Sequence, residues 1–221
     1  MQIRHIYIRI IKQLHERPGF GFILYVVVYL YNIYGSCMLH IHARTKPTNI
    51  DPSAIIHPTA CISPWGVNIG RDVVIGKKTV IKPRTTIQSG VIIHDRCVIG
   101  DTGFQIFRYK TKRLPLIHTG DVCISDGVYI GPGTCIDRGF FRKTTYIGPR
   151  TKIGANVHIG HNIWIKSDSI IEDYVTVGGN TIIGEKVHIG NNSTISNRII
   201  ISSNSVLKPG TITTRDISDS A

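Results

Sequence analysis

The sequence is poor in the features that mark several protein classes. Its five cysteines are odd in number and none is spaced CxxC, which excludes a zinc ribbon and a disulfide scaffold and predicts reduced thiols in a cytoplasmic compartment. Acidic residues are also scarce, because 14 Asp and Glu stand against 26 Lys and Arg, for a formal net charge of +12. That excess favours anionic partners such as phosphorylated ligands or anionic lipid. With 221 residues, 42% of them apolar, the chain is long and apolar enough to fold, which excludes disorder over its whole length.

An apolar run long enough to span a bilayer is missing as well. The charge-free stretch from Phe20 to Tyr34 is about 15 residues long, short of the ~20 that a spanning helix needs. Before it, residues 1–17 place isoleucines at helical spacing among Arg and Lys, which predicts a basic amphipathic helix ended by Pro18-Gly19. We expect residues 1–47 to form a separate helical and apolar segment. It either caps the domain behind it or, through residues 1–35, contacts a membrane surface.

What the sequence has instead is a six-residue repeat over residues 48–221. An aliphatic residue returns at every sixth position from Ile69 to Ile99, from Ile124 to Ile136 and from Ile147 to Leu207. Glycine often follows the aliphatic residue, and a small or β-branched residue comes four positions after it. One buried residue in every six fits neither a helix nor a single strand.

A three-sided coil of short strands explains this period. Three strands make one coil of about 18 residues, the aliphatic side chains point inward, and successive coils stack through parallel backbone hydrogen bonds. The glycines are expected to serve turns with unusual backbone angles. The sequence therefore predicts a mainly β protein, a parallel β-helix of about seven to eight coils with a short helical N-terminal segment.

Two insertions interrupt the repeat, near residues 101–122 and 138–146. Both are basic and aromatic, and the second contains Phe140, Phe141 and Arg142. A ring that stacks on an aromatic side chain while Arg holds a phosphate suits such a composition, so these insertions are predicted to wall a nucleotide or phosphate site. Further along, His158 and His161 flank an inward isoleucine, which places both on the outer surface near a corner. A neutral imidazole there can take a proton from an attacking hydroxyl or amine.

The repeat resembles that of the hexapeptide-repeat acyltransferases over residues 48–212. The resemblance implies a left-handed parallel β-helix and a homotrimer with sites in the clefts between prisms. Three segments are similar, in the same order, to segments of the UDP-3-O-acylglucosamine N-acyltransferases of lipid A synthesis: Asp101–Phe104, Thr134–Gly139 and Ile159–Asn162.

This closer resemblance implies roles for individual residues. His161 matches the general base, and the glycine one coil later, Gly179, matches the backbone N–H donor to the oxyanion. The matching segments imply substrate-binding residues Gly103, Phe104, Asp137, Arg138, His158 and Asn162, and donor-binding residues Gly178, Gly179 and Arg198. No metal is implied.

The chain also departs from that family. Arg198 stands where the family has a second histidine, and Gly154 where it has an aspartate. The separate N-terminal nucleotide-binding domain and the C-terminal helical extension that meets acyl carrier protein have no counterpart. The expected reaction is therefore acetyl transfer from acetyl-CoA to an amino or hydroxyl group of a nucleotide-linked or polysaccharide-bound sugar, at the inner face of the cytoplasmic membrane or free in the cytoplasm. Acyl-carrier-protein-dependent N-acylation is the alternative.

Two other functions compete with the transferase. A carbonic anhydrase of the same prism fold needs three histidines on zinc, but the His-x4-His spacing of that family is absent. A catalytically inactive sugar-binding β-helix is compatible with Arg198 in place of histidine. Nucleic-acid binding is not expected, because the aromatic residues are confined to the N-terminal segment and the insertions.

Overall fold

The fold is known from a computed structural model that describes residues 20–218. One helix, α2 (Phe20–Thr45), precedes a long series of short strands, and one antiparallel hairpin interrupts the series. The basic helix predicted for residues 1–17 lies outside the described residues.

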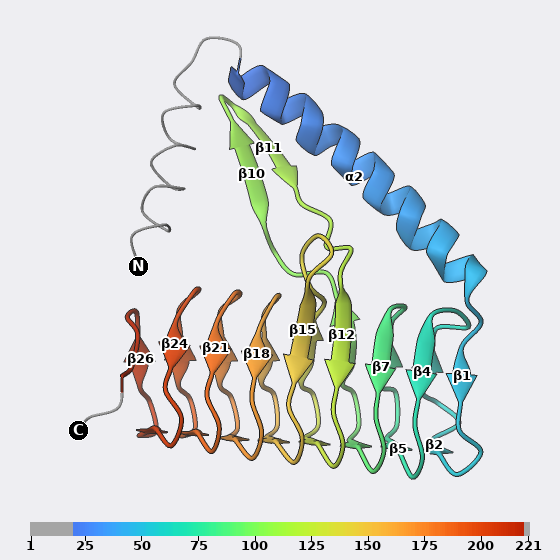
Figure 1. Ribbon diagram of the computed structural model, residues 1–221, viewed down its shortest axis with the longest axis vertical. Coiled ribbons are helices and arrows are strands. Elements are labelled where there is room, and N and C mark those ends of the chain that lie inside the picture. Colours follow the sequence, from blue (N-terminus) through green and yellow to red (C-terminus); the bar gives the residue numbers. More distant parts are fainter. Residues whose placement is uncertain (1–19, 219–221) are drawn as a thin grey trace.

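Three parallel sheets of eight strands each make the three sides of a prism (Figure 1). The first sheet contains β1 (Asn49–Ile50), β4 (Val67–Ile69), β7 (Thr85–Ile87), β12 (Asp121–Ile124), β15 (Thr144–Ile147), β18 (Trp164–Ile165), β21 (Ile182–Ile183) and β24 (Ile200–Ile201). The second contains β2 (Ile55–Ile56), β5 (Val74–Ile75), β8 (Ile92–Ile93), β13 (Tyr129–Ile130), β16 (Lys152–Ile153), β19 (Ile170–Ile171), β22 (His188–Ile189) and β25 (Val206–Leu207). The third contains β3 (Cys61–Ile62), β6 (Val80–Ile81), β9 (Val98–Asp101), β14 (Cys135–Asp137), β17 (His158–Ile159), β20 (Thr176–Val177), β23 (Thr194–Ile195) and β26 (Ile212–Thr213).

The chain visits the three sheets in turn, so that each strand pairs with the strands one coil before and one coil after it. His158 and Ile159 of β17, for example, lie in register with Thr176 and Val177 of β20. This confirms the predicted left-handed parallel β-helix, with eight coils.

The interior is a set of stacked isoleucine and valine side chains. Every aliphatic repeat position from Ile69 to Leu207 is buried, and most are no more than 1% exposed. The small residues of the repeat are buried as well, and their hydroxyls bond backbone carbonyls, as in the 2.8 Å bond from Thr134 to Gly154. Burying one such aliphatic side chain stabilises the fold by about 2–3 kcal/mol, so the repeat itself supplies the core.

Except for Gly100 (φ 83°), the glycines that follow the aliphatic repeat positions have a different role from the one expected. Gly148, Gly154 and Gly184 do not take left-handed backbone angles; instead a Cβ on Gly154 would lie 2.7 Å from the backbone nitrogen of Asp173 in the next coil. The left-handed residue comes two positions later and is usually not glycine, as at Asn156 (φ 53°) and Lys186 (φ 54°). The sequence expectation was wrong on this point because close stacking of coils, rather than the turn, excludes a side chain.

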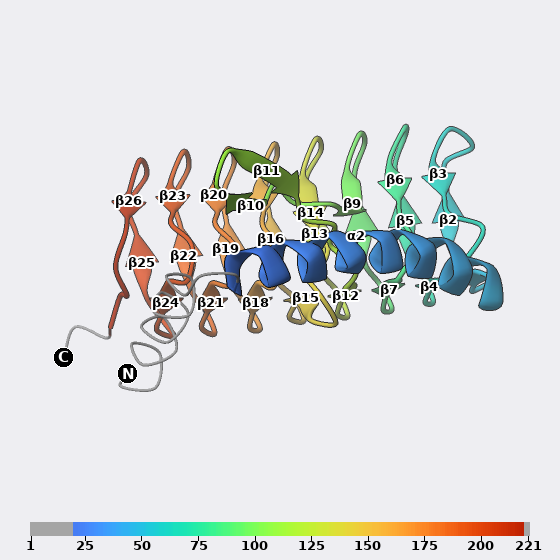
Figure 2. The ribbon, with the colours of Figure 1, turned by 90° about the horizontal axis from the view of Figure 1, so that it is seen from above.

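The first insertion forms the hairpin of β10 (Ile106–Tyr109) and β11 (Lys112–Pro115), which stands out from the prism beneath α2 (Figures 1 and 2). Tyr25 packs against Tyr109 of the hairpin with ring centroids 5.7 Å apart, and Asn32 donates a 2.7 Å hydrogen bond to the Pro115 carbonyl. α2 therefore runs obliquely from the hairpin, which braces it, down to the start of β1 (Figure 1). Within the described residues, no helix combines the length and the hydropathy that crossing a membrane requires.

Candidate functional site

The predicted catalytic residues lie at the corner where the chain passes from the third sheet to the first. His161 stands between β17 and β18, and Gly179 stands one coil later between β20 and β21. The two are in direct contact, because a Cβ on Gly179 would lie 2.5 Å from Cε1 and 2.7 Å from Nδ1 of His161. Only glycine leaves room for the imidazole to lie against this backbone. Among the described residues, none accepts a hydrogen bond from the Gly179 N–H.

A chain of amide hydrogen bonds holds the His161 ring. The backbone N–H of Phe140 donates to Oδ1 of Asn162 at 2.7 Å, and Nδ2 of Asn162 donates to Oδ1 of Asn180 at 3.1 Å. Nδ2 of Asn180 then lies 3.2 Å from Nε2 of His161. Because a backbone N–H can only donate, the first bond sets the orientation of both amides.

The same chain assigns the tautomer of His161. The amide of Asn180 presents hydrogen to Nε2, so Nε2 is the unprotonated nitrogen and the proton of the neutral ring is on Nδ1. Burial lowers the pKa of His161 below its usual value, and the nearby cations Arg198 and Lys143 lower it further, while Asp137 opposes them. The ring is thus kept as a neutral base with its lone pair on a defined atom.

A second histidine packs against this base. His118, fully buried, comes from the end of the first insertion, and its ring lies 4.7 Å from that of His161 in an edge-on arrangement. Its Nδ1 accepts the N–H of Gly103 at 3.1 Å, and its Nε2 has no hydrogen-bond partner within the described residues. Burial lowers the pKa of His118 to about 4, so this ring is neutral at physiological pH.

Asp137 joins the two ends of the site. Its carboxylate is buried, it lies beside Gly103 and it pairs with Nε2 of His158 at 3.4 Å. The hydrogen bond that His158 donates to the Asp137 carboxylate, assisted by one to Cys135, raises the pKa of His158 to about 10. His158 is therefore a cation on the outer surface and not a second base.

Cys135, Asp137 and His158 are also the group of described residues whose ligand atoms gather closely enough for a metal. Their sulfur, oxygen and nitrogen atoms lie within 4.8 Å of one another. Thiolate, carboxylate and imidazole suit zinc and similar metals. Since the carboxylate already pairs with His158, a metal would have to replace a proton there.

The remaining predicted residues are divided between structural and exposed positions. Arg138 is buried and its Nε donates to the Gly100 carbonyl at 2.8 Å, so it braces the corner. Phe104, in contrast, is 93% exposed next to Gly103. Gly178 packs on the backbone of Asn197, and the Arg198 N–H donates to the Gly179 carbonyl at 2.9 Å.

Sequence reasoning missed part of this cluster. His118 lies in the insertion predicted to wall the site, but its packing against His161 was not predicted, because the path of the insertion back to the corner leaves no periodic signal. Cys135 was given no role beside Asp137. Asn180 was missed although a signal existed, since it follows Asn162 by 18 residues and so had to stack on it.

The fold and this corner together define a class, the left-handed β-helix proteins built from hexapeptide repeats. Residues 144–179 match the bacterial transferase hexapeptide family, described as six repeats. That match covers β15 to β20 with His161 and Gly179, and so includes the corner described above.

The chain is similar, more particularly, to enzymes that acylate amino sugars. It is 37% identical over 90 residues to the UDP-3-O-acylglucosamine N-acyltransferase of a Caulobacter species, and this covers 41% of the chain and 26% of the relative. The same enzyme of Rhodopseudomonas palustris is 39% identical over 93 residues, covering 42% and 25%. The chain thus spans about a quarter of the length of the curated relatives that it matches.

Solved structures show the same resemblance. LpxA from Acinetobacter baumannii matches with a TM-score of 0.52 and 25% identity, over 77% of this chain and 66% of that one. LpxA from Bacteroides fragilis, a UDP-N-acetylglucosamine acyltransferase, matches with a TM-score of 0.52 and 26% identity, over 76% and 68%. The β-helix is therefore shared with these two LpxA structures.

Proposed function

We propose that this protein is an acyltransferase that moves an acyl group from acetyl-CoA to an amino or hydroxyl group of a nucleotide-linked or polysaccharide-bound sugar. The observation that carries the proposal is the contact between a neutral His161 ring and Gly179, whose N–H has no partner among the described residues. A base and an oxyanion donor side by side are what acyl transfer from a thioester requires.

The reaction follows from these positions. The acceptor nitrogen or oxygen attacks the thioester carbon, and its proton passes to Nε2 of His161, the nitrogen that holds the lone pair. The acceptor must therefore take the place of the Asn180 amide at Nε2. The Gly179 N–H stabilises the negative charge on the tetrahedral intermediate. When the C–S bond breaks, the imidazolium returns the proton to the CoA thiolate.

The donor is proposed to approach along the late coils, past Gly178 and Arg198. The Arg198 side chain is close enough to lower the pKa of His161, so a phosphate of the donor bound there would also change the base. Acetyl-CoA is the donor proposed here, and an acyl carrier protein carrying a longer chain is the alternative. Release of free thiol with each donor separates the two.

A homotrimer is part of the proposal. Phe104 is 93% exposed although it directly follows Gly103, which touches both Asp137 and His118. An aromatic side chain so close to buried site residues is well placed to meet a neighbouring prism. Light scattering on the full chain is expected to give three times the mass of 24.5 kDa, and a Phe104→Ser variant should shift toward the monomer.

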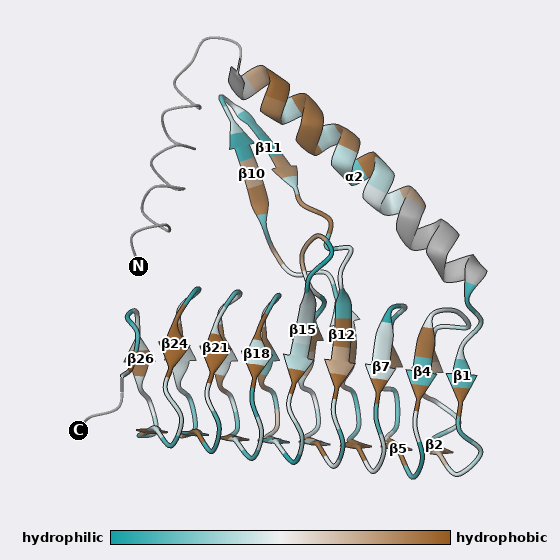
Figure 3. Ribbon diagram, in the orientation of Figure 1, coloured by the Kyte–Doolittle hydropathy of each residue, from teal (hydrophilic) through white to brown (hydrophobic). Residues whose placement is uncertain are grey.

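Contact with a membrane surface through residues 1–35 is proposed for the outer face of α2. Figure 3 shows an apolar run in the part of the helix that projects from the prism. Four of its large apolar side chains are more than half exposed: Phe22, Ile23, Val27 and Leu30. Lys112 lies 5.2 Å from the Tyr25 ring and adds positive charge beside them. Sedimentation with anionic vesicles, compared with a Val27→Asp/Leu30→Asp variant, tests this contact.

The catalytic proposal is tested with His161→Gln. Acetyl-CoA is incubated with a panel of nucleotide-linked amino sugars, and free thiol is measured. Loss of a general base is expected to lower kcat by about 10²–10⁴-fold, whereas the control His188→Gln, remote from the corner, keeps the full rate. Full turnover by His161→Gln would reject the mechanism, and no turnover by the wild type with any acceptor would favour an inactive sugar-binding protein.

A further inference from the structure

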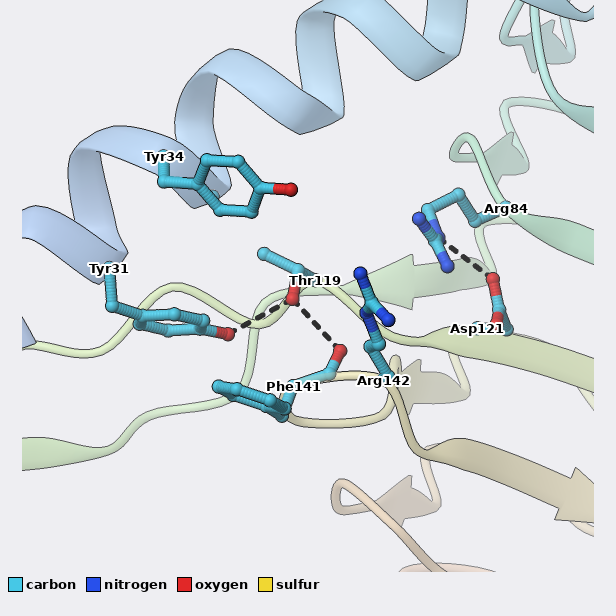
Figure 4. A pocket seen from close by; sticks show the side chains of 8 residues that line it. Tyr31, Tyr34, Arg84, Thr119, Asp121, Phe141 and Arg142 are labelled. Carbon is cyan, nitrogen blue, oxygen red and sulfur yellow. Dashed lines mark hydrogen bonds and ion pairs between the residues drawn. The ribbon is translucent and has the colours of Figure 1, made fainter.

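A hollow of about 460 Å³ lies between α2 and the first sheet, at the same corner of the prism as His161 (Figure 4). Its walls come from four separate parts of the chain: α2, the turn between β6 and β7, the segment that leads into β12, and the loop between β14 and β15. None of its side chains is used by the chemistry proposed above.

One wall of the hollow is aromatic and is held in place. The rings of Tyr31 and Phe141 stack with centroids 5.0 Å apart and an angle of 16° between them. The Tyr31 hydroxyl lies 3.0 Å from the Thr119 hydroxyl, which itself donates to the Phe141 carbonyl at 2.8 Å. Phe141 also adopts φ 63°, a left-handed angle that a bulky side chain rarely takes. The Phe141 ring is half exposed in this wall.

The backbone of α2 packs closely against this wall at Gly35. Gly35 is buried, and a Cβ in its place would lie 2.9 Å from Cγ2 of Thr119. Next to it, Tyr34 is 55% exposed and forms the upper side of the hollow in Figure 4. The two exposed rings, Tyr34 and Phe141, give the hollow aromatic surfaces against which a planar group can stack.

The opposite wall is cationic. Nε of Arg84 bonds Oδ1 of Asp121 at 2.8 Å, so that pair is nearly neutral. Arg142 has no acidic partner among the described residues, and its guanidinium is turned into the hollow. A second hollow of about 580 Å³ continues past Arg84 and Asp121 and reaches Lys46. The two hollows together form a trough, which holds more positive than negative charge along its length.

We propose that this trough binds a nucleoside diphosphate, with the phosphates at Arg142 and Arg84 and the base against Tyr34 or Phe141. Guanidinium groups bind phosphates through paired hydrogen bonds, and bases stack on aromatic side chains regardless of their identity. The proposal rests on the proposed function, since both the nucleotide-linked acceptor and CoA carry such a group. It assigns that group to α2 and the insertions; if the group is that of CoA, this site replaces the donor route past Arg198 proposed above.

The hollow is connected to the His161 ring through two consecutive residues, Phe140 and Phe141. Phe141 lines the hollow, while the adjacent Phe140 lies 6.4 Å from the His161 ring and 5.3 Å from the His118 ring, between centroids. The N–H of Phe140 is also the donor that begins the amide chain to His161. A ligand that fixes the loop between β14 and β15 would therefore also fix the orientation of the His161 ring.

Calorimetry on the full chain with UDP and, separately, with CoA tests the site and identifies its source. For the ligand that occupies the trough, Arg142→Gln is expected to raise Kd by about tenfold or more, and Tyr34→Leu by about tenfold. Arg96→Gln removes the same charge from an exposed turn between β8 and β9, at another corner of the prism, and is expected to change Kd by less than about twofold. Sensitivity of UDP assigns the trough to the acceptor, and sensitivity of CoA assigns it to the donor.

Equal affinities of the wild type and Arg142→Gln for both ligands would overturn the inference, as would no binding of either. The proposed function fails separately. His161→Gln is expected to bind UDP or CoA normally while it loses acyl transfer. If Arg142 governs nucleotide binding but no acceptor is acylated, the site stands and the transferase proposal falls. If acylation proceeds with a KM that Arg142→Gln leaves unchanged, the transferase stands and the site falls.

Discussion

The position of the proton on the His161 ring can be reversed by the substitution Asn180→Asp. Asn180→Asp replaces the amide that donates to Nε2 with a carboxylate that accepts, at a separation of 3.2 Å. Aspartate tolerates the left-handed angle of this position, φ 61°, so the turn should survive. A hydrogen bond to a charged group contributes about 1.5–3 kcal/mol, and each pKa unit corresponds to about 1.4 kcal/mol. The variant is thus expected to raise the pKa of His161 by about 1–2 units.

The direction of this pKa change can be measured in the pH dependence of kcat/KM. In the wild type the pKa of His161 lies below its usual value, so the ring is neutral at pH 7, with the proton on Nδ1. In Asn180→Asp the Nε2–H form and the imidazolium are favoured, so the acid limb of kcat/KM moves to higher pH by the same 1–2 units. Nitrogen-15 NMR of labelled histidine reports both the tautomer and the titration without any substrate, and His161→Gln identifies the signal.

A matched control separates this effect from the added charge. Asn192→Asp changes an exposed asparagine with φ 59° at the equivalent turn position, away from the corner, and should leave the titration of His161 in place. Wild-type His161 carrying its neutral proton on Nε2, or an unchanged pKa in Asn180→Asp, would refute the assignment of the amide chain.

Three further predictions concern its neighbours. Gly179→Ala places a methyl group 2.5 Å from the His161 ring, so kcat/KM should fall by about 10²-fold; an undiminished rate would show that the contact is not needed. The pKa of His118 is lowered to about 4, so the unfolded chain binds the extra proton and stability should fall by about 3 kcal/mol between pH 6.5 and 4; urea unfolding of His118→Gln should lack this acid loss. The pKa of His158 is raised to about 10, so its pairing stabilises the fold below pH 6.5 and is lost as pH rises through 10; Asp137→Asn should return the NMR titration of His158 toward 6.5, and an unchanged titration would exclude the pair.

The sequence predicted the fold because the repeat is the fold. An aliphatic residue at every sixth position can be buried only in a three-sided coil, so the eight coils and the contact of His161 with Gly179 follow from counting along the chain. The roles of those two residues stay predictions, tested by the variants above.

Most of what could not be predicted from the sequence lies outside the repeat. The insertion that brings His118 to the corner has no period, and its path depends on contacts such as Asn32 with Pro115. The glycines were misread because six-residue spacing does not show which coil a Cβ would strike. Local patterns encode local turns, whereas packing between separate segments depends on surfaces that only the folded chain forms.

The left-handed turns leave the molecule with an untapped reserve of stability. Lysine and arginine occupy several of these turns, among them Lys78, Arg96 and Lys186, where glycine or asparagine would fit with less strain. Lys78 and Arg96 stack in adjacent coils, where the Arg96 N–H donates to the Lys77 carbonyl, so changes at these two turns would be coupled. Improvements at turns in distant coils, such as Arg96 and Lys186, would add almost independently. Substitutions at separate turns could thus stabilise this scaffold against heat or denaturant without changing the coils proposed to carry its chemistry.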